Sequence, residues 1–438
     1  MSLGLYLKGQ FLPSEDSDGE PQIFDRAKLE DLERWISNVA NDELEWTQWS
    51  EDEEGAPFLM VALHPGAEHI MLSTIENCNL LVSAATSSAG PGYHIFVCDL
   101  LRKLGQVMHI EWISDIDGDY FDETGYFETG DRDKLYSEFD NWIRSLARTV
   151  QDLAREGAKF HMAMPIDSYQ FDVTLPILTQ MGPRSFDWIK AVEQDPAQAR
   201  GIFPWWEGGH GAEYYLGRAL CHMWYTVRWR PPLVELEAEL LTLCLQYLET
   251  AFSLDPDLDY PWREWAEIVD YLECECEYIE DVKRKIELMD TDEMLVGYRR
   301  RSLRKDLGGG WSIALPGDFV EELEEGQTFL AYDETKNLRV TCMTASDTTG
   351  QPLDAVEILT KIKVMDDPLK HERGKIIARA FFEKAQEDDA TFWMLRGVCA
   401  CLGSFAQITI CYEDERDRDW ALDVWHSLDH KQNYQQDQ

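Results

Sequence analysis

One stretch of the sequence combines histidine, glutamate and glycine, the residue types of an acid–base site. It is Phe203-Pro204-Trp205-Trp206-Glu207-Gly208-Gly209-His210-Gly211-Ala212-Glu213. Glycines let a ligand approach the backbone, and His210 with Glu207 or Glu213 could transfer a proton. His222 follows three helical turns later, so no HExxH metal spacing is present. We favour a simpler interpretation: a loop that caps a helix starting near Glu213, with the tryptophans in the core. This alternative site comprises Trp205, Trp206, Glu207, His210 and Glu213.

A second stretch has carboxylates spaced as in a calcium loop, Asp115-x-Asp117-Gly118-Asp119. An EF-hand loop that began at Asp115 would need glycine at its sixth position and glutamate at its twelfth. Tyr120 and Tyr126 occupy these positions, so the calcium pattern fails.

Aromatic residues are interleaved with these carboxylates. Exposed aromatic rings are costly in a segment that is only solvated, whereas aromatic anchors with a charged rim are typical of protein interfaces. We therefore predict a recognition segment; a merely solvated loop is the other interpretation. The predicted partner-binding residues are Asp115, Asp117, Asp119, Tyr120, Phe121, Asp122, Glu123, Tyr126, Phe127 and Glu128.

The remaining candidates for a metal or cofactor site are incomplete. Cys274 and Cys276 lie two apart in a helical pattern and therefore point to nearly opposite faces. Cys399 and Cys401 could share a strand face, but the sequence offers no second pair of ligands. Gly90-Pro91-Gly92 precedes a helix without a Walker or GxGxxG pattern, which favours a structural turn. We predict no metal, no cofactor and no catalytic residues, because no complete catalytic motif occurs in the sequence.

The charge of the chain restricts its partners. Its 438 residues include 83 acidic and 40 basic ones, giving a formal net charge of −43. Such a surface repels nucleic-acid phosphates and anionic lipids, so we predict neither nucleic-acid nor membrane binding. It attracts basic proteins and accelerates encounter with them. The alternative is that the acidity maintains solubility or reflects a salt-adapted host.

The sequence also predicts a cytoplasmic protein. The amino terminus lacks the charged region and long apolar run of a signal peptide. No window approaches the ~18 uninterrupted apolar residues of a membrane helix. The ten cysteines are scattered through apolar stretches, as expected of reduced core residues.

Hydrophobic periodicity predicts an α+β multidomain protein. In an N-terminal α+β domain, 1–160, a helix over Asp25–Ala40 precedes strands at 58–63, 70–75 and 80–85, a helix over 93–104, a strand at 109–113 and a helix over 132–156. A mostly helical region, 161–298, follows, with helices over 214–229, 233–254 and 262–289. Pro231-Pro232 and Asp255-Pro256 stop the helices, and we find no sustained 34-residue repeat.

A basic and glycine-rich linker, 299–310, predicts a domain boundary, followed by a C-terminal α/β domain, 311–430, and a polar tail, 431–438. Strands at 311–315, 328–333 and 338–344, a helix over 353–364, strands at 375–383, 391–401 and 405–412, and a helix over 419–428 are predicted. This order, and the opening Trp311-Ser312-Ile313-Ala314-Leu315-Pro316, resembles the Mog1/PsbP-like α/β/α sandwich. The resemblance implies an accessory or binding role.

We therefore predict a non-catalytic protein-binding protein. Its acidic, aromatic-rich character resembles that of the large acidic proteins found beside polymorphic toxins in bacteria. The resemblance implies an immunity protein or chaperone that neutralises a basic toxin or effector domain by occlusion. The alternative is a hydrolase or small-molecule enzyme with its site near Trp206 and His210.

Overall fold

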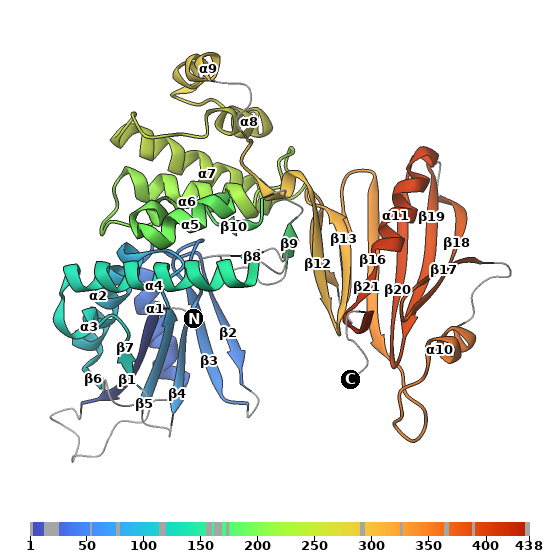
Figure 1. Cartoon of the computed structure of the whole chain (residues 1–438), viewed down its shortest axis with the longest axis horizontal. Helices are drawn as coiled ribbons and strands as arrows, with labels where there is room; N and C mark the ends of the chain where they lie inside the picture. The colour runs from blue at the N-terminus through green and yellow to red at the C-terminus, as the bar shows by residue number, and fades with distance from the viewer. Residues whose placement is uncertain are drawn as a thin grey trace. The chain divides into compact units, whose positions relative to one another are not determined.

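In a computed structural model, the chain folds into two compact units (Figure 1). Unit 1 comprises Met1–Pro165, Thr174–Thr226 and Glu239–Val296, and unit 2 comprises Ile166–Val173, Val227–Ala238 and Gly297–Gln438. The structure describes residues 3–12, 26–52, 55–75, 79–113, 120–154, 160–161, 169–171, 175–289, 294–324, 327–362, 368–387 and 390–433. Both units combine helices with sheets, which confirms the α+β multidomain class.

Unit 1 is built on an antiparallel sheet, the N-terminal sheet, with strand order β2-β3-β4-β5-β1-β6, in which β7 also pairs with β1. Its strands are β1 (Gly4–Phe11), β2 (Trp46–Glu51), β3 (Pro57–Ala62), β4 (Ile70–Ile75), β5 (Asn79–Ala85), β6 (Ile110–Ile113) and β7 (Phe121–Asp122). A smaller sheet contains β8 (Phe160–His161), β10 (Ile177–Thr179) and β11 (Gly182–Arg184).

Alternation along the strands gives the N-terminal sheet one buried face. Leu5, Leu7, Val61, Leu72 and Val82 are all at most 2% exposed and belong to one core. The helices α1 (Arg26–Val39) and α2 (Pro91–Met108) contribute to the same core and therefore cover this face. Along each strand, the side chains that alternate with these buried residues point to the opposite face of the sheet.

The remaining helical elements up to residue 288 belong to unit 1 with the N-terminal sheet, except that Glu235–Ala238, at the start of one helix, belong to unit 2. They are α3 (Tyr126–Thr129), α4 (Arg132–Ala154), α5 (Phe186–Gln194), the 3-10 helix η1 (Pro196–Ile202), α6 (Ala212–Tyr225), α7 (Glu235–Leu254), α8 (Trp262–Leu272) and α9 (Ile279–Leu288). Because Trp205 and Tyr214 pack in the core of the sheet, the two predicted domains 1–160 and 161–298 form one unit instead of two. The predicted helix over 262–289 is broken after Leu272, where Glu273 has a left-handed φ of 48°.

Unit 2 contains a four-stranded sheet, order β21-β13-β12-β9, and a seven-stranded antiparallel C-terminal sheet, order β14-β15-β16-β20-β19-β18-β17. The strands of the first are β9 (Tyr169–Phe171), β12 (Ser302–Gly308), β13 (Trp311–Pro316) and β21 (Asp429–His430). Those of the second are β14 (Val320–Glu324), β15 (Thr328–Tyr332), β16 (Lys336–Thr344), β17 (Leu369–Arg373), β18 (Ile376–Glu387), β19 (Ala390–Cys401) and β20 (Ser404–Tyr412). The helical elements are η2 (Tyr298–Arg300), α10 (Ala355–Lys361), η3 (Glu415–Asp417), α11 (Arg418–Ser427) and η4 (Lys431–Asn433).

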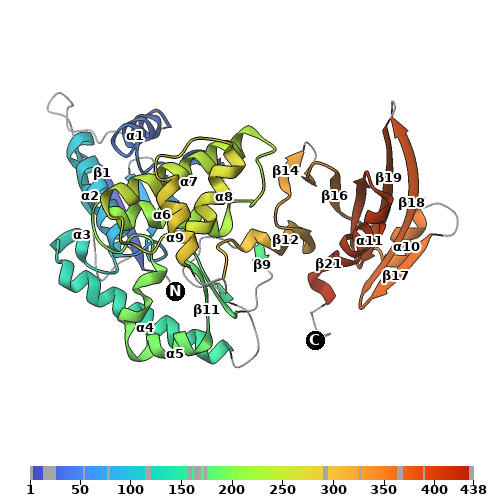
Figure 2. The same ribbon diagram turned by 90° about the horizontal axis from the view of Figure 1, so that it is seen from above.

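The helices α10 and α11 lie on opposite faces of the C-terminal sheet (Figure 2). Ile358 and Leu359 of α10 share a core with Val398 and Ala400. Trp425 of α11 lies against Gly397 instead, where a Cβ atom would come within 2.7 Å of its indole nitrogen. Because residues 397 and 398 are neighbours on β19, they point to opposite faces.

The basic segment predicted to be a linker is part of the four-stranded sheet. β12 pairs with β13 along most of its length and with β9 on its other side. Its basic residues have internal partners: Arg304 donates to the backbone carbonyl of Ser427 at 3.1 Å, and the Lys305 ammonium lies 4.1 Å from the Tyr169 ring. Just before the strand, Arg299 is buried and contacts Glu321 at 2.9 Å. The prediction of a linker over 299–310 is therefore wrong.

Within the described residues, the helices are all too short or too polar to cross a bilayer.

The pairing of β12 predicts resistance to protease. Trypsin should cleave the native chain slowly after Arg304 and Lys305, because a paired strand cannot enter the protease site without local unfolding. Mass spectrometry of early digestion products should instead find cuts at exposed basic residues outside helices and strands, such as Lys375 in the turn between β17 and β18. A stable fragment starting at Lys305 or Asp306 as the first product would contradict the strand assignment.

Candidate functional site

The predicted recognition segment is partly described. Asp115, Asp117 and Asp119 lie outside the described residues. Tyr120 is half-buried and stacks on Tyr6 of β1, with ring centroids 5.8 Å apart. Phe121 lies opposite Tyr6 in the β1–β7 pairing.

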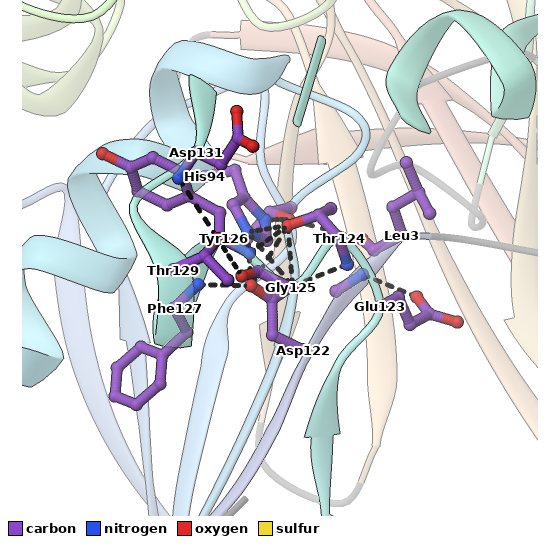
Figure 3. A network of polar contacts seen from close by, with 12 residues as sticks. Leu3, His94, Asp122, Glu123, Thr124, Gly125, Tyr126, Phe127, Thr129 and Asp131 are labelled. Carbon is purple, nitrogen blue, oxygen red and sulfur yellow. Dashed lines mark hydrogen bonds and ion pairs between the residues drawn. The ribbon is translucent and has the colours of Figure 1, made fainter. Parts of the chain in front are cut away.

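The next residue, Asp122, is buried at the centre of a polar network (Figure 3). Its carboxylate accepts hydrogen bonds from the backbone N–H groups of Thr124 and Phe127, at 2.8 and 2.6 Å. The His94 ring nitrogen Nε2 lies 3.3 Å from Oδ1 of Asp122. Burial alone would raise the pKa of Asp122, but the contacts with His94 and with these N–H groups outweigh burial and lower it. Asp122 therefore holds the turn in place from inside.

Two of the predicted contact aromatics are also internal. Tyr126 and Phe127 are only 5% and 9% exposed. Arg102 donates to both of their backbone carbonyls and lies over both rings, 5.1 and 5.5 Å from the centroids. The expectation that Tyr126, Phe127 and Asp122 face a partner is therefore wrong, because an internal carboxylate and arginine fold the turn inward. Glu123 and Glu128 remain exposed.

His94, Cys98 and Asp122 form the only cluster with metal-ligating atoms in the part of the chain that the structure describes, all within 4.8 Å. Both His94 ring nitrogens already have partners, since Nδ1 lies 2.7 Å from the Thr86 hydroxyl. Burial and the Asp122 carboxylate raise the pKa of the Cys98 thiol well above its ordinary value, although a metal needs the thiolate. We assign this cluster to the scaffold.

The Phe203–Glu213 stretch divides between two environments. Trp205 is buried against Tyr214, with ring centroids 4.5 Å apart, and its indole N–H donates to the Gly209 carbonyl at 3.1 Å. His210 is exposed and packs against the same Tyr214 ring, with centroids 4.6 Å apart and an interplanar angle of 38°. Its carboxylate partner is Glu43, 2.8 Å from Nε2, and not either of the predicted glutamates.

Glu43 adjoins a buried charge cluster around Arg218. The Arg218 guanidinium is 1% exposed, pairs with Glu45 and donates to the Tyr214 hydroxyl at 2.6 Å. His222 Nε2 lies 3.5 Å from the second Glu45 oxygen. Burial tends to raise the pKa of Glu45, but the contacts with His222 and Arg218 reverse this and lower it. The cluster has the donors of an acid–base site, but its charges are already neutralised in pairs.

The other predicted residues, Trp206, Glu207 and Glu213, line a cavity of about 570 Å³ along the outer face of α6. A second cavity of about 200 Å³ continues along the helix and shares Met181, Leu220 and Asp259 with the first. We call this joint feature the α6 groove. The sequence pointed to one end of it, because tryptophans, glycines and glutamates are adjacent there. Leu216, Leu220 and Asp259 had no such signal, since they resemble ordinary helix and loop residues.

The open face of the N-terminal sheet carries a second candidate surface. Strand register places Tyr6, Ser83, Met71 and Met60 in one row across the sheet, continued by Phe121. Tyr6 and Met71 are each 38% exposed. On β1 to β5, all of which are described, the positions of this face include no Asp or Glu and only one charged residue, Lys8. We call the row from Phe121 to Met60 the aromatic stripe.

Comparisons with known proteins identify no family. No family model matches the chain, and no curated protein does. Among solved structures, a Bacteroides thetaiotaomicron VPI-5482 protein, whose crystal structure was determined at 1.50 Å resolution, matches with 14% sequence identity and a TM-score of 0.24. The alignment covers 29% of this chain and 47% of that one, so it spans less than half of the other protein.

Replacing Asp122 with asparagine should destabilise unit 1 by roughly 1.5–3 kcal/mol, because an amide cannot accept all the hydrogen bonds that the buried carboxylate accepts. Urea unfolding monitored by tryptophan fluorescence measures the loss. The exposed neighbour Glu128 is the control, and Glu128→Gln should stay within about 0.5 kcal/mol of the parent. Equal stability of both variants would show that the network does not hold the turn.

His64 should make folding sensitive to acid. It is 1% exposed, its Nδ1 accepts the Gly66 N–H at 2.9 Å, and burial, then Arg218 and His222, lower its pKa well below the ordinary value of 6.5. Below about pH 6.5 only the unfolded chain takes up this proton, so stability present above that pH is lost as the pH falls. His64→Asn should flatten the decline of Tm between pH 7 and pH 5, and the less buried His69→Asn should leave it steep. A slope unchanged by His64→Asn would contradict this assignment.

Proposed function

We propose that this chain is a non-catalytic protein-binding protein and that the aromatic stripe is its contact surface. The observation that carries the proposal is the contrast between this face and the rest of the chain. A chain with 83 acidic residues has none on five adjacent strands of one sheet face. Tyrosine, phenylalanine and methionine take their place, and these residue types are enriched at the centres of protein interfaces.

The partner in this proposal is a basic protein. Exposed carboxylates such as Glu111, on the same face as Gln10, and Glu123 border the stripe. The uncharged anchors at the centre and the acidic residues at the rim affect different rates of binding. Rim charges set the association rate, and anchors set the dissociation rate. We extend the proposal to an immunity protein or chaperone of the bacterial cytoplasm that neutralises a toxin or effector domain by occlusion. The net charge of −43 and the residue types of the aromatic stripe support this extension.

The C-terminal domain fits the same kind of role. We propose that residues 311–430 form a Mog1/PsbP-like α/β/α sandwich, a group whose members are mostly accessory and binding proteins. The placement of α10 and α11 on opposite faces of one antiparallel sheet supports this proposal.

An enzyme with a site near Trp206 and His210 is the second candidate. It is favoured by the His210–Glu43 contact, in which burial raises the pKa of Glu43 although His210 opposes the shift. A carboxyl group with a raised pKa beside an exposed imidazole is suited to proton transfer. Catalysis here is less well supported, because Trp206 lies in the α6 groove while His210 packs against Tyr214, a core residue of the N-terminal sheet.

The test is binding to a basic protein encoded beside this chain in its host. Tyr6→Ala and Phe121→Ala should each raise the dissociation rate about 30-fold, as expected for hot spots of ~2 kcal/mol. Glu111→Lys should instead slow association and weaken its dependence on salt. Surface plasmon resonance separates the two rates.

The control is Val107→Ala, which removes an apolar side chain that is 55% exposed on α2. It should bind as the parent does, and all variants should keep the parent melting temperature. If the partner binds and the Tyr6 and Phe121 variants dissociate at the parent rate, the stripe is not the interface.

A further inference from the structure

The α6 groove combines an apolar floor with an acidic rim. The floor includes Leu216, Leu220 and Met181, and at the far end the exposed side chains of Met294 and Leu295 continue it. A surface that joins two cavities and exposes methionine and leucine costs free energy unless a ligand covers it. The floor therefore needs a ligand with apolar groups.

The rim of the groove is acidic, whereas its floor is apolar. Glu207, Glu213 and Asp259 line the larger cavity and are all exposed. Glu213 and Asp259 have no hydrogen-bond or ion-pair partner among the residues that the structure describes. Among the described residues, Arg200 is the one basic side chain that lines this cavity, and Arg263 lines the smaller one. The Arg200 guanidinium lies over the Trp206 ring at 5.3 Å. The rim thus favours a ligand with positive charge, and the Arg200 contact shows that a guanidinium fits against this wall.

The length of the groove indicates the form of the ligand. Its lining runs from Glu213 in the first turn of α6 to Trp224 in the last. Eleven residues of helix span about 16 Å, which corresponds to about five residues of extended chain. Arginine and lysine carry their charge on an apolar stem, so alternating basic and apolar side chains satisfy floor and rim together.

We propose that the α6 groove binds an extended peptide segment in which arginine or lysine alternates with apolar residues. The apolar side chains occupy the floor formed by Leu216 and Leu220. The cationic groups reach Glu213 and Asp259. The site is separate from the aromatic stripe and does not depend on the proposed function.

A fluorescein-labelled seven-residue peptide of alternating leucine and arginine is the probe, and fluorescence anisotropy is the measurement. The intact chain should bind it at least tenfold more tightly than a peptide of alternating glycine and arginine, which has the same charge without the apolar groups. Leu220→Ser should weaken binding of the leucine–arginine peptide and leave the glycine–arginine peptide unaffected. Arginine amide, a small cation, should bind far more weakly than either.

Nonspecific attraction to an acidic chain is the main rival explanation, so the charge control is matched. Glu213→Gln with Asp259→Asn should reduce affinity at least tenfold. Glu372→Gln with Glu415→Gln, two exposed residues of unit 2, makes the same change in net charge and should reduce it less than twofold. Equal losses in the two double variants, or equal binding of the two peptides, would overturn the proposal. Tyr6→Ala should leave the peptide affinity unchanged, so the groove and the stripe are tested independently.

Discussion

The buried guanidinium of Arg218 is the interaction on which the arrangement of unit 1 depends. A charge removed from water must be paired, and breaking such a pair costs several kcal/mol. Arg218 meets this requirement by contacting the turn between α1 and β2, through Glu45 and the backbone carbonyl of Asp42 at 3.2 Å. The rings of Tyr214 and Tyr247 also lie near the guanidinium, with centroids 5.6 and 5.0 Å away. The helical layer is therefore fixed to the N-terminal sheet at one position along α6.

Because Arg218 is paired on one side of α6, the two faces of this helix have different roles. The inner face carries Tyr214, Arg218 and His222 and is committed to the scaffold. The outer face carries Glu213, Leu216 and Leu220 and forms the wall of the groove. Close contact at Gly217, where a Cβ atom would come within 2.2 Å of the Pro204 carbonyl oxygen, holds the Phe203–Glu213 stretch against the helix. The glycine thus serves helix packing, and the adjacent tryptophans separate into core and groove as a consequence.

Much of the fold follows from local periodicity. The strands around Leu59, Leu72 and Val82 and the helices α2 and α7 were predicted close to their observed bounds because the sequence alternates or repeats at the right spacing there. β1 was not predicted, although Leu5 and Leu7 alternate, because its partners lie on β5 and β6, far along the chain. β12 was misjudged because its basic residues are neutralised by residues such as Glu321. Pairing partners that are distant in sequence cannot be identified from a local sequence pattern.

The candidate site shows the same limit. The sequence identified Tyr120, Phe121 and Trp206 as chemically unusual, and all three lie at least partly at the surface. It could not show that Asp122 and Arg102 fold Tyr126 and Phe127 inward, since this depends on hydrogen bonds to a helix 24 residues earlier. Nor could it pair His210 with Glu43, which lies on the turn after α1.

Unit 2 draws its four-stranded sheet from separate parts of the chain, because Phe171 of β9 lies opposite Leu303 of β12. These residues are 303 − 171 = 132 positions apart. At ordinary rates of synthesis, about 5–20 residues per second, β9 leaves the ribosome roughly 7–26 s before its partner strand exists. During that interval its backbone donors and acceptors have no strand to pair with, so the newly made chain carries an unpaired edge through the synthesis of most of the helical layer. The four-stranded sheet of unit 2 therefore cannot be completed until β12, β13 and β21 have been synthesised.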